Sequence, residues 1–235
     1  MSTIQSFFRG VLFWLFWIFA TLTGLMVYWA LFRVSGLEPE LVSILESWIG
    51  VEGTNLRVLE FVTNGLLGLM EGLLLGLFQW VALRGRIKQA SGWIPATALG
   101  YGLGLVGFWG AFVLITGNQL PEGTPIEWAF ELGLLRSGLL GLTLGLLQWL
   151  VLRGQFRGHV WWITVVILAI IGAWFTQWFL SEGLAYVVFG AVTGIPLTLM
   201  LAARERAKRA RVVKTPEKVR EESPLERLNH LTQSD

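Results

Sequence analysis

The chain has 235 residues, of which 54% are hydrophobic and only 14% are charged, and its mean hydropathy is +0.62. A soluble domain carries about 25% charged residues, so the composition excludes an ordinary soluble protein and indicates an integral membrane protein. The chain has no cysteine, and both histidines, His159 and His230, lie outside the apolar runs, which argues against disulfides, iron–sulfur clusters, haem and zinc sites.

Apolar runs of about 20 residues cross a bilayer as helices. The sequence therefore predicts an all-α polytopic helix bundle with about six transmembrane helices, occupying residues 1–203. The first run is too long for the core of a signal peptide and lacks a clear cleavage site, so we expect it to remain as a span. The expected spans are 11–32, 61–83, 93–116, 132–152, 161–180 and 184–203.

Two segments outside the spans have their own patterns. In the long connection 34–60, apolar residues at helical spacing around Leu41, Leu45 and Trp48 predict an amphipathic surface helix. The tail 204–235 is charged and contains few apolar residues. We expect it to begin as a helical extension beside the anionic inner leaflet and then to become disordered.

The distribution of lysine and arginine predicts the orientation. Cytoplasmic segments of membrane proteins carry an excess of these residues. If the N-terminus is cytoplasmic, the outer segments hold only Arg33 and Arg57, so both termini are expected in the cytoplasm of a bacterial plasma membrane or thylakoid. The inner segments then hold Arg9, Arg84, Arg86, Lys88, Arg153, Arg157, Arg204, Arg206, Lys208, Arg209 and Arg211.

One ten-residue pattern occurs twice, as GLFQWVALRG at 76–85 and GLLQWLVLRG at 145–154. Each copy ends a run directed inward, and a short turn then leads to Trp93 or Trp162 at the start of the next run. We interpret this as an internal parallel repeat of a two-helix hairpin, with convergence of membrane composition as the alternative. The predicted helix-junction residues are Gln79, Trp80, Arg84, Gln148, Trp149 and Arg153.

Small residues precede each glutamine at four-residue spacing, as in Gly68, Gly72 and Gly76. Such stripes let helix backbones approach closely, and a glutamine that continues the stripe can form a hydrogen bond across the contact. We expect packing among these six helices. Docking against helices of another protein is the alternative.

The pattern G-x-x-Q-W-x-x-L-R, followed by a basic turn and a tryptophan, resembles uncharacterised multi-pass membrane proteins of cyanobacteria and similar phototrophs with repeated hairpins. In this chain the resemblance covers roughly residues 64–180. It implies a thylakoid or plasma membrane. It implies no activity and assigns no functional residue.

Three polar residues within the expected spans are candidate functional residues: Asn64, Glu71 and Arg136. An ionisable group inside the membrane is costly and is a functional candidate by default. Aligning the two repeats places Arg136 about one turn nearer the outside than Glu71, so an ion pair between them is the first hypothesis. A protonated Glu71 bonded to a carbonyl, a solute or proton site, and a chlorophyll-magnesium ligand remain as alternatives.

These features favour a non-enzymatic accessory or assembly subunit of a larger, photosynthetic or other membrane complex. The alternative is a small-solute transporter or its substrate-binding membrane component, with Asn64, Glu71 and Arg136 along the path. A pigment- or quinone-binding protein is a third hypothesis, disfavoured because no histidine lies in the spans. The expected partners are the lipid bilayer and a membrane protein, not nucleic acid. We expect no catalytic residue, metal site or cofactor.

Overall fold

The computed structural model describes residues 3–49, 54–117, 126–156 and 159–220, and within these ranges the protein is all-helical, as predicted. The π-helical segment η1 (Trp29–Val34) continues the first helix, and the 3-10 turn η2 (Ala90–Gly92) precedes the fourth. The α-helices of the described ranges are α1 (Thr3–Tyr28), α2 (Leu37–Ile49), α3 (Thr54–Leu83), α4 (Trp93–Thr116), α5 (Ile126–Leu152), α6 (Trp161–Phe179) and α7 (Glu182–Arg220).

Six of these helices, all except α2, are long and apolar enough to cross a membrane. This confirms the prediction of about six apolar helices long enough to span a membrane. Helix α7 is longer than the expected span 184–203, because it continues through the basic residues that follow as far as Arg220. Helix α2 occupies the connection where a surface helix was expected, and it packs against α3 and η1 outside the bundle.

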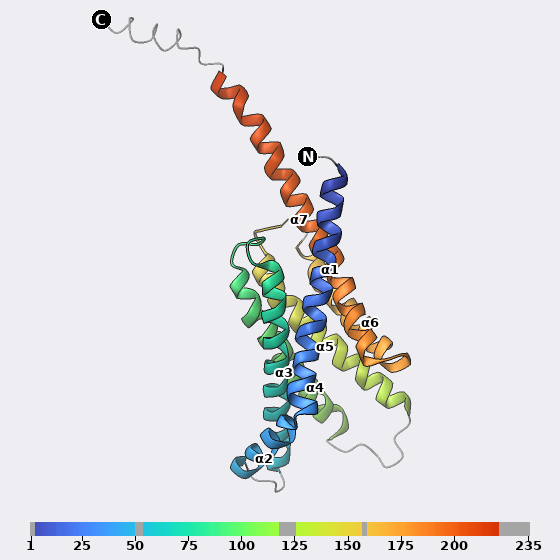
Figure 1. Ribbon diagram of the computed structural model, residues 1–235. Coiled ribbons are helices and arrows are strands. Elements are labelled where there is room, and N and C mark those ends of the chain that lie inside the picture. Colours follow the sequence, from blue (N-terminus) through green and yellow to red (C-terminus); the bar gives the residue numbers. More distant parts are fainter. Residues whose placement is uncertain (1–2, 50–53, 118–125, 157–158, 221–235) are drawn as a thin grey trace, which may run out of the picture.

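The spanning helices form a closed ring. Each packs against its neighbours in the order α1, α3, α4, α5, α6 and α7, and α7 packs back against α1. The N-terminus and the extension of α7 lie at one end of the bundle, here called the terminal end, and α2 lies at the opposite end, the far end (Figure 1). A ring of six helices leaves its central axis to be filled by side chains.

Glycines bring neighbouring backbones together around the ring. A Cβ atom added at Gly72 would lie 2.5 Å from the carbonyl oxygen of Thr97, and one at Gly141 would lie 2.7 Å from the Cα of Ile167. Only glycine permits such an approach, because any side chain would push the two helices apart. Gly100 against Leu144, Gly24 against Leu75 and Gly190 against Ile18 show similarly close approaches at three further interfaces.

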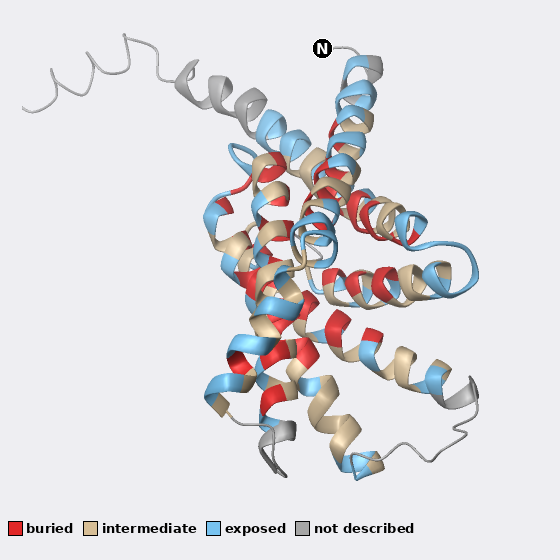
Figure 2. Ribbon diagram, turned by 60° about the horizontal axis from the view of Figure 1, so that its bottom comes forward, coloured by how far each residue is buried: buried red, intermediate tan, exposed pale blue. Residues whose placement is uncertain are grey.

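The buried residues gather where the helices meet (Figure 2). Many of the exposed residues are large and apolar, which suits contact with lipid. Trp17, Trp93 and Trp162 are fully buried. The described charged residues at the terminal end are mostly exposed. This distribution is expected for a bundle surrounded by hydrocarbon and flanked by charged ends.

The two copies of the repeated pattern end in the same turn. After Leu83 and Leu152 the chain turns at Gly85 and Gly154, whose φ values are +76° and +78°. A left-handed residue just after a helix is where glycine is favoured, since it carries no Cβ. The amides of Arg84 and Arg153 each donate to the carbonyl four residues earlier, at 2.8 Å in both copies.

Candidate functional site

Gln79 links three helices inside the ring. Its side-chain oxygen accepts a hydrogen bond from the indole Nε1 of Trp93 on α4, 2.9 Å away, and its Nε2 donates to the hydroxyl of Thr21 on α1 at 3.1 Å. Gln79 is itself almost completely buried. All of its bonds therefore replace water within the protein, and each joins a different neighbour of α3.

Gln148 makes the corresponding pair of bonds one hairpin later. Its oxygen accepts from the Nε1 of Trp162 on α6 at 3.1 Å, and its Nε2 donates to the hydroxyl of Thr97 on α4 at 3.0 Å. The two glutamines thus have the same kinds of partner in the same relative places. This equivalence is what an internal repeat predicts, and the duplication itself stays a prediction.

A related contact joins the first and the last spanning helix, α1 and α7. The indole Nε1 of Trp17 on α1 donates to the hydroxyl of Thr193 on α7 at 3.0 Å. Among the described residues, side-chain bonds at this level therefore cross five interfaces of the ring and leave the α6–α7 interface without one. Val166 on α6 stands four residues after Trp162, where Thr21 and Thr97 stand four residues after their own tryptophans. Valine has no hydroxyl to accept such a bond.

The three tryptophans fill the axis of the ring at this level. The rings of Trp17 and Trp93 lie 5.8 Å apart and those of Trp93 and Trp162 lie 5.7 Å apart, both edge to face. The leucines that follow Gln79, Gln148 and Thr193 by four residues are also fully buried. They are Leu83, Leu152 and Leu197. The terminal half of the bundle is therefore closed by packed indoles, leucines and satisfied polar groups, here called the tryptophan–glutamine seal.

Trp80, Arg84, Trp149 and Arg153 do not take part in this seal. They lie at the terminal surface, where the guanidinium of Arg84 is 6.0 Å from the ring of Trp80 and that of Arg153 is 6.0 Å from the ring of Trp149. A cation over an indole at a helix end suits the headgroup region of a bilayer. Of the predicted helix-junction residues, the glutamines alone reach into the ring.

A cavity of about 230 Å³ lies on the other side of the seal, toward the far end. Residues of all six spanning helices and of η1 line it. Five exposed residues are part of its wall, so the cavity reaches the surface of the bundle: Trp29, Arg33, Arg136, Gln177 and Glu182. Its polar and aromatic lining consists of Tyr28, Trp29, Arg33, Asn64, Glu71, Tyr101, Arg136, Ser137, Trp174, Gln177, Glu182, Tyr186 and Phe189.

The three polar residues predicted within the spans all line this cavity. Asn64 donates a hydrogen bond from its side-chain nitrogen to the carbonyl of Glu60 at 2.9 Å. Glu71 and Arg136 face the same space from α3 and α5 but are not in direct contact. The two ion pairs that the structure records among its described residues are Arg33–Glu38 and Lys208–Glu205. The expected ion pair is thus replaced by two charges in one cavity.

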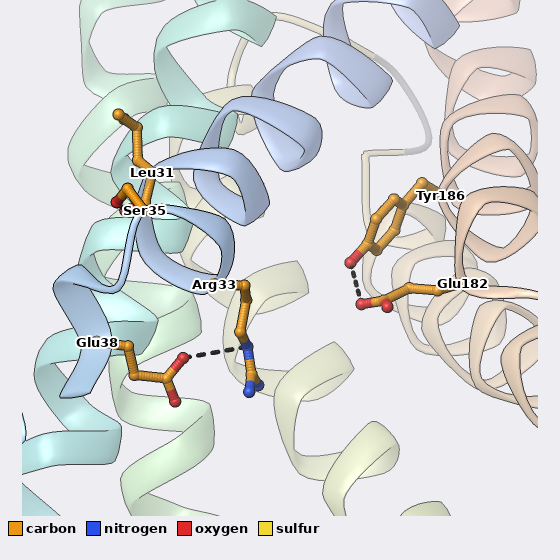
Figure 3. A network of polar contacts seen from close by, with 6 residues as sticks. All are labelled: Leu31, Arg33, Ser35, Glu38, Glu182 and Tyr186. Atoms are coloured by element: carbon orange, nitrogen blue, oxygen red, sulfur yellow. Dashed lines mark hydrogen bonds and ion pairs between the residues drawn. The ribbon is translucent and has the colours of Figure 1, made fainter.

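Two polar pairs involve residues of the cavity wall, namely Arg33, Glu182 and Tyr186 (Figure 3). The Nε of Arg33 lies 3.1 Å from the carboxylate of Glu38, which ties η1 to α2. The hydroxyl of Tyr186 donates to the carboxylate of Glu182 at 2.6 Å, within α7. Each of these charged residues therefore already has a partner.

Sequence reasoning missed most of the cavity wall. Counting from the three buried tryptophans recovers much of it, because Leu25, Tyr101 and Ile170 each follow their tryptophan by eight residues and all three line the cavity. Trp29, Leu105 and Trp174 each follow by twelve residues and line it too. The spacing after these tryptophans could therefore have predicted part of the cavity wall. That prediction requires treating Trp17 as the counterpart of Trp93 and Trp162.

No group of three or more metal-ligating side chains occurs in the part of the chain that the structure describes. No protein-family model, curated protein or solved structure matches the chain. The cavity offers two carboxylates, two guanidinium groups, hydroxyls and amides within an apolar bundle, which is an arrangement for holding a small polar molecule.

Proposed function

We propose that this integral membrane protein binds a small polar solute in its central cavity, as a solute transporter or the substrate-binding membrane component of one. The observation that carries the proposal is a polar cavity walled by all six spanning helices. Burying so many polar groups in a membrane bundle is costly unless they have a use. We propose no enzymatic reaction for the cavity.

The seal supports an uptake direction. The cavity reaches the surface toward the far end, and the tryptophan–glutamine seal closes the axis toward the terminal end. A site open to one side and closed to the other corresponds to one state of an alternating-access carrier. The α6–α7 interface, which lacks a polar bond at the level of the seal among the described residues, is where we expect the ring to open.

The membrane and the orientation are also part of the proposal. Arginine and lysine side chains gather at the terminal end, at the two hairpin turns and on α7, so we propose that this end faces the cytoplasm. The resemblance to phototroph proteins favours a thylakoid or bacterial plasma membrane. The solute would then enter from the lumen or the periplasm.

The test is a set of thermal unfolding measurements on the purified protein with glucose, butylamine, butyrate and 4-aminobutyrate. Ala173→Phe fills the cavity, because Ala173 lines it, and Leu168→Phe adds a ring on the exposed face of the same helix as a control. We expect at least one solute to raise the Tm of the wild type and of Leu168→Phe but not that of Ala173→Phe. No shift with any of the four, or an equal shift in Ala173→Phe, would contradict the proposal.

An accessory or assembly subunit of a membrane complex is the second proposal. Helix α2 lies outside the ring and is anchored by the buried Leu45, while Ile44 is 51% exposed and Trp48 is 81% exposed. An apolar surface of this kind suits either the bilayer surface or a membrane-protein partner. Migration on a native gel after mild extraction decides between them. Migration with a large complex supports this second proposal, and migration alone contradicts it for stable complexes.

A further inference from the structure

Two opposite charges in the cavity have no partner of their own. Among the residues that the structure describes, neither the carboxylate of Glu71 nor the guanidinium of Arg136 takes part in an ion pair or a side-chain hydrogen bond. The other charges of the cavity are engaged, since Arg33 pairs with Glu38 and Glu182 accepts from Tyr186. The cavity thus presents one carboxyl group and one guanidinium group, neither in direct contact with a partner, to whatever enters it.

These two charges stand at different depths. Helices α3 and α5 run in the same direction, and the equivalent bonds of Gln79 and Gln148 mark a common level. Glu71 precedes its glutamine by eight residues and Arg136 precedes its glutamine by twelve. At 1.5 Å per residue, the backbone of Arg136 is about 6 Å nearer the far end than that of Glu71. A carboxylate therefore lies deep and a guanidinium lies near the mouth.

We propose that the cavity binds a small zwitterion, with its ammonium group at Glu71 and its acidic group at Arg136. This inference rests on the proposed small-solute function and names the class of solute. A ligand with one charge would leave the opposite residue unpaired in the membrane, whereas a zwitterion compensates both. The depth difference favours charges separated by several bonds over those of an α-amino acid.

The aromatic lining favours the same orientation. Tyr101 lines the cavity at the level of Glu71, because it follows Trp93 by eight residues and Glu71 precedes Gln79, the partner of Trp93, by eight. Aromatic faces attract ammonium groups and offer nothing comparable to a carboxylate or phosphate. An acidic group is better placed at Arg136, whose planar guanidinium can bind two oxygens at once.

Two kinds of molecule carry both an ammonium group and an acidic group: a free solute and the headgroup of phosphatidylethanolamine. The experiment distinguishes between them. The first measurement is the Tm of the full chain in detergent with 4-aminobutyrate, whose three methylenes separate the charges. We expect a rise of about 3 to 6 °C at tenfold excess over Kd. Butylamine and butyrate, which each carry one of the two charges, should have little effect.

Three variants assign the effect to the two charges. Glu71→Gln and Arg136→Gln should each abolish the rise, and Arg84→Gln, which changes an arginine at the terminal surface, should retain it. A second measurement does not depend on these variants folding. In Ser137→Cys, a single cysteine in the cavity wall, 4-aminobutyrate should slow the reaction with a small thiol reagent several-fold more than butylamine or butyrate does.

The outcomes separate this inference from the function on which it rests. An equal effect of glucose, butylamine or butyrate would overturn the zwitterion and leave solute binding in place. An effect that persists in both charge variants would also overturn it. Slowed labelling in phosphatidylethanolamine nanodiscs but not in phosphatidylglycerol nanodiscs, with no effect of 4-aminobutyrate, would support the same chemistry from a lipid headgroup. No effect in any arm would overturn the inference.

Discussion

The indole nitrogen of Trp93 donates a hydrogen bond to the side-chain oxygen of Gln79 at 2.9 Å, and this contact joins the two helices of the first hairpin. The same pair recurs fourteen residues apart in the second hairpin, as Trp162 and Gln148. Each glutamine also reaches back to a threonine on the preceding helix of the ring. These hydrogen bonds belong to the tryptophan–glutamine seal, which closes the terminal half of the bundle. The cavity lies on the side of the seal that faces the far end.

Removing either glutamine should destabilise the bundle. In Gln79→Ala the indole nitrogen of Trp93 and the hydroxyl of Thr21 lose a buried partner, and Gln148→Ala has the same consequence for Trp162 and Thr97. We expect each to lower the free energy of unfolding by about 1 to 3 kcal/mol. Chemical denaturation in mixed micelles measures this change in the free energy of unfolding.

Gln177→Ala is the control, because Gln177 lines the cavity and is exposed. Its effect should be within about 0.5 kcal/mol of zero. If the three variants are equally stable, the hydrogen bonds of the tryptophan–glutamine seal do not hold the ring of helices together.

Two glycines inside spanning helices should differ in how substitution by alanine changes the stability of the protein. A Cβ at Gly72 would lie 2.5 Å from the backbone of α4, so Gly72→Ala should separate the helices and cost about 1 to 3 kcal/mol. At Gly138 there is nothing within 4 Å of the new Cβ, so Gly138→Ala should be neutral or stabilise by up to about 1 kcal/mol. Thermal unfolding of both variants measures the difference. A loss of stability in Gly138→Ala alone would be inconsistent with the packing described.

The spans and the polar residues inside them could be predicted from sequence because each depends on local patterns. Apolar runs fix the helices, and Glu71 and Arg136 stand out against them. The threonine partners of Gln79 and Gln148 were not predicted, since Thr21 and Thr97 lie on other helices and the sequence alone does not show which helices are neighbours. Closure of the ring by Trp17 and Thr193 joins residues 176 positions apart, which only the fold brings together.

The proposed orientation predicts which ends are accessible from outside the cell. The chain has no cysteine, so single-cysteine variants give unambiguous labels. Ser47→Cys on α2 should react with a membrane-impermeant maleimide in intact cells. Lys88→Cys in the first hairpin turn should react only after permeabilisation. The reverse pattern would invert the topology, and the direction of solute entry with it.

The ion pair between Arg33 and Glu38 should contribute little to stability. The side chain of Arg33 is 62% exposed, and exposed pairs contribute about 0 to 1 kcal/mol. Arg33→Gln and Glu38→Gln should therefore each change the free energy of unfolding by less than about 1 kcal/mol, and the double variant should resemble either single one. A larger loss in chemical denaturation would mean that α2 is tied to the ring mainly through this pair.

The most direct test of the central claim is the labelling of Ser137→Cys from each side of a sealed membrane. Ser137 lines the cavity, whereas Ala82, which is equally buried, belongs to the packed terminal half. A small charged thiol reagent added on the far side should modify Ser137→Cys rapidly and Ala82→Cys hardly at all, and the same reagent on the terminal side should modify neither. Equal protection of both cysteines from the far side would contradict an open polar cavity, and rapid reaction of Ala82→Cys from the terminal side would contradict the seal.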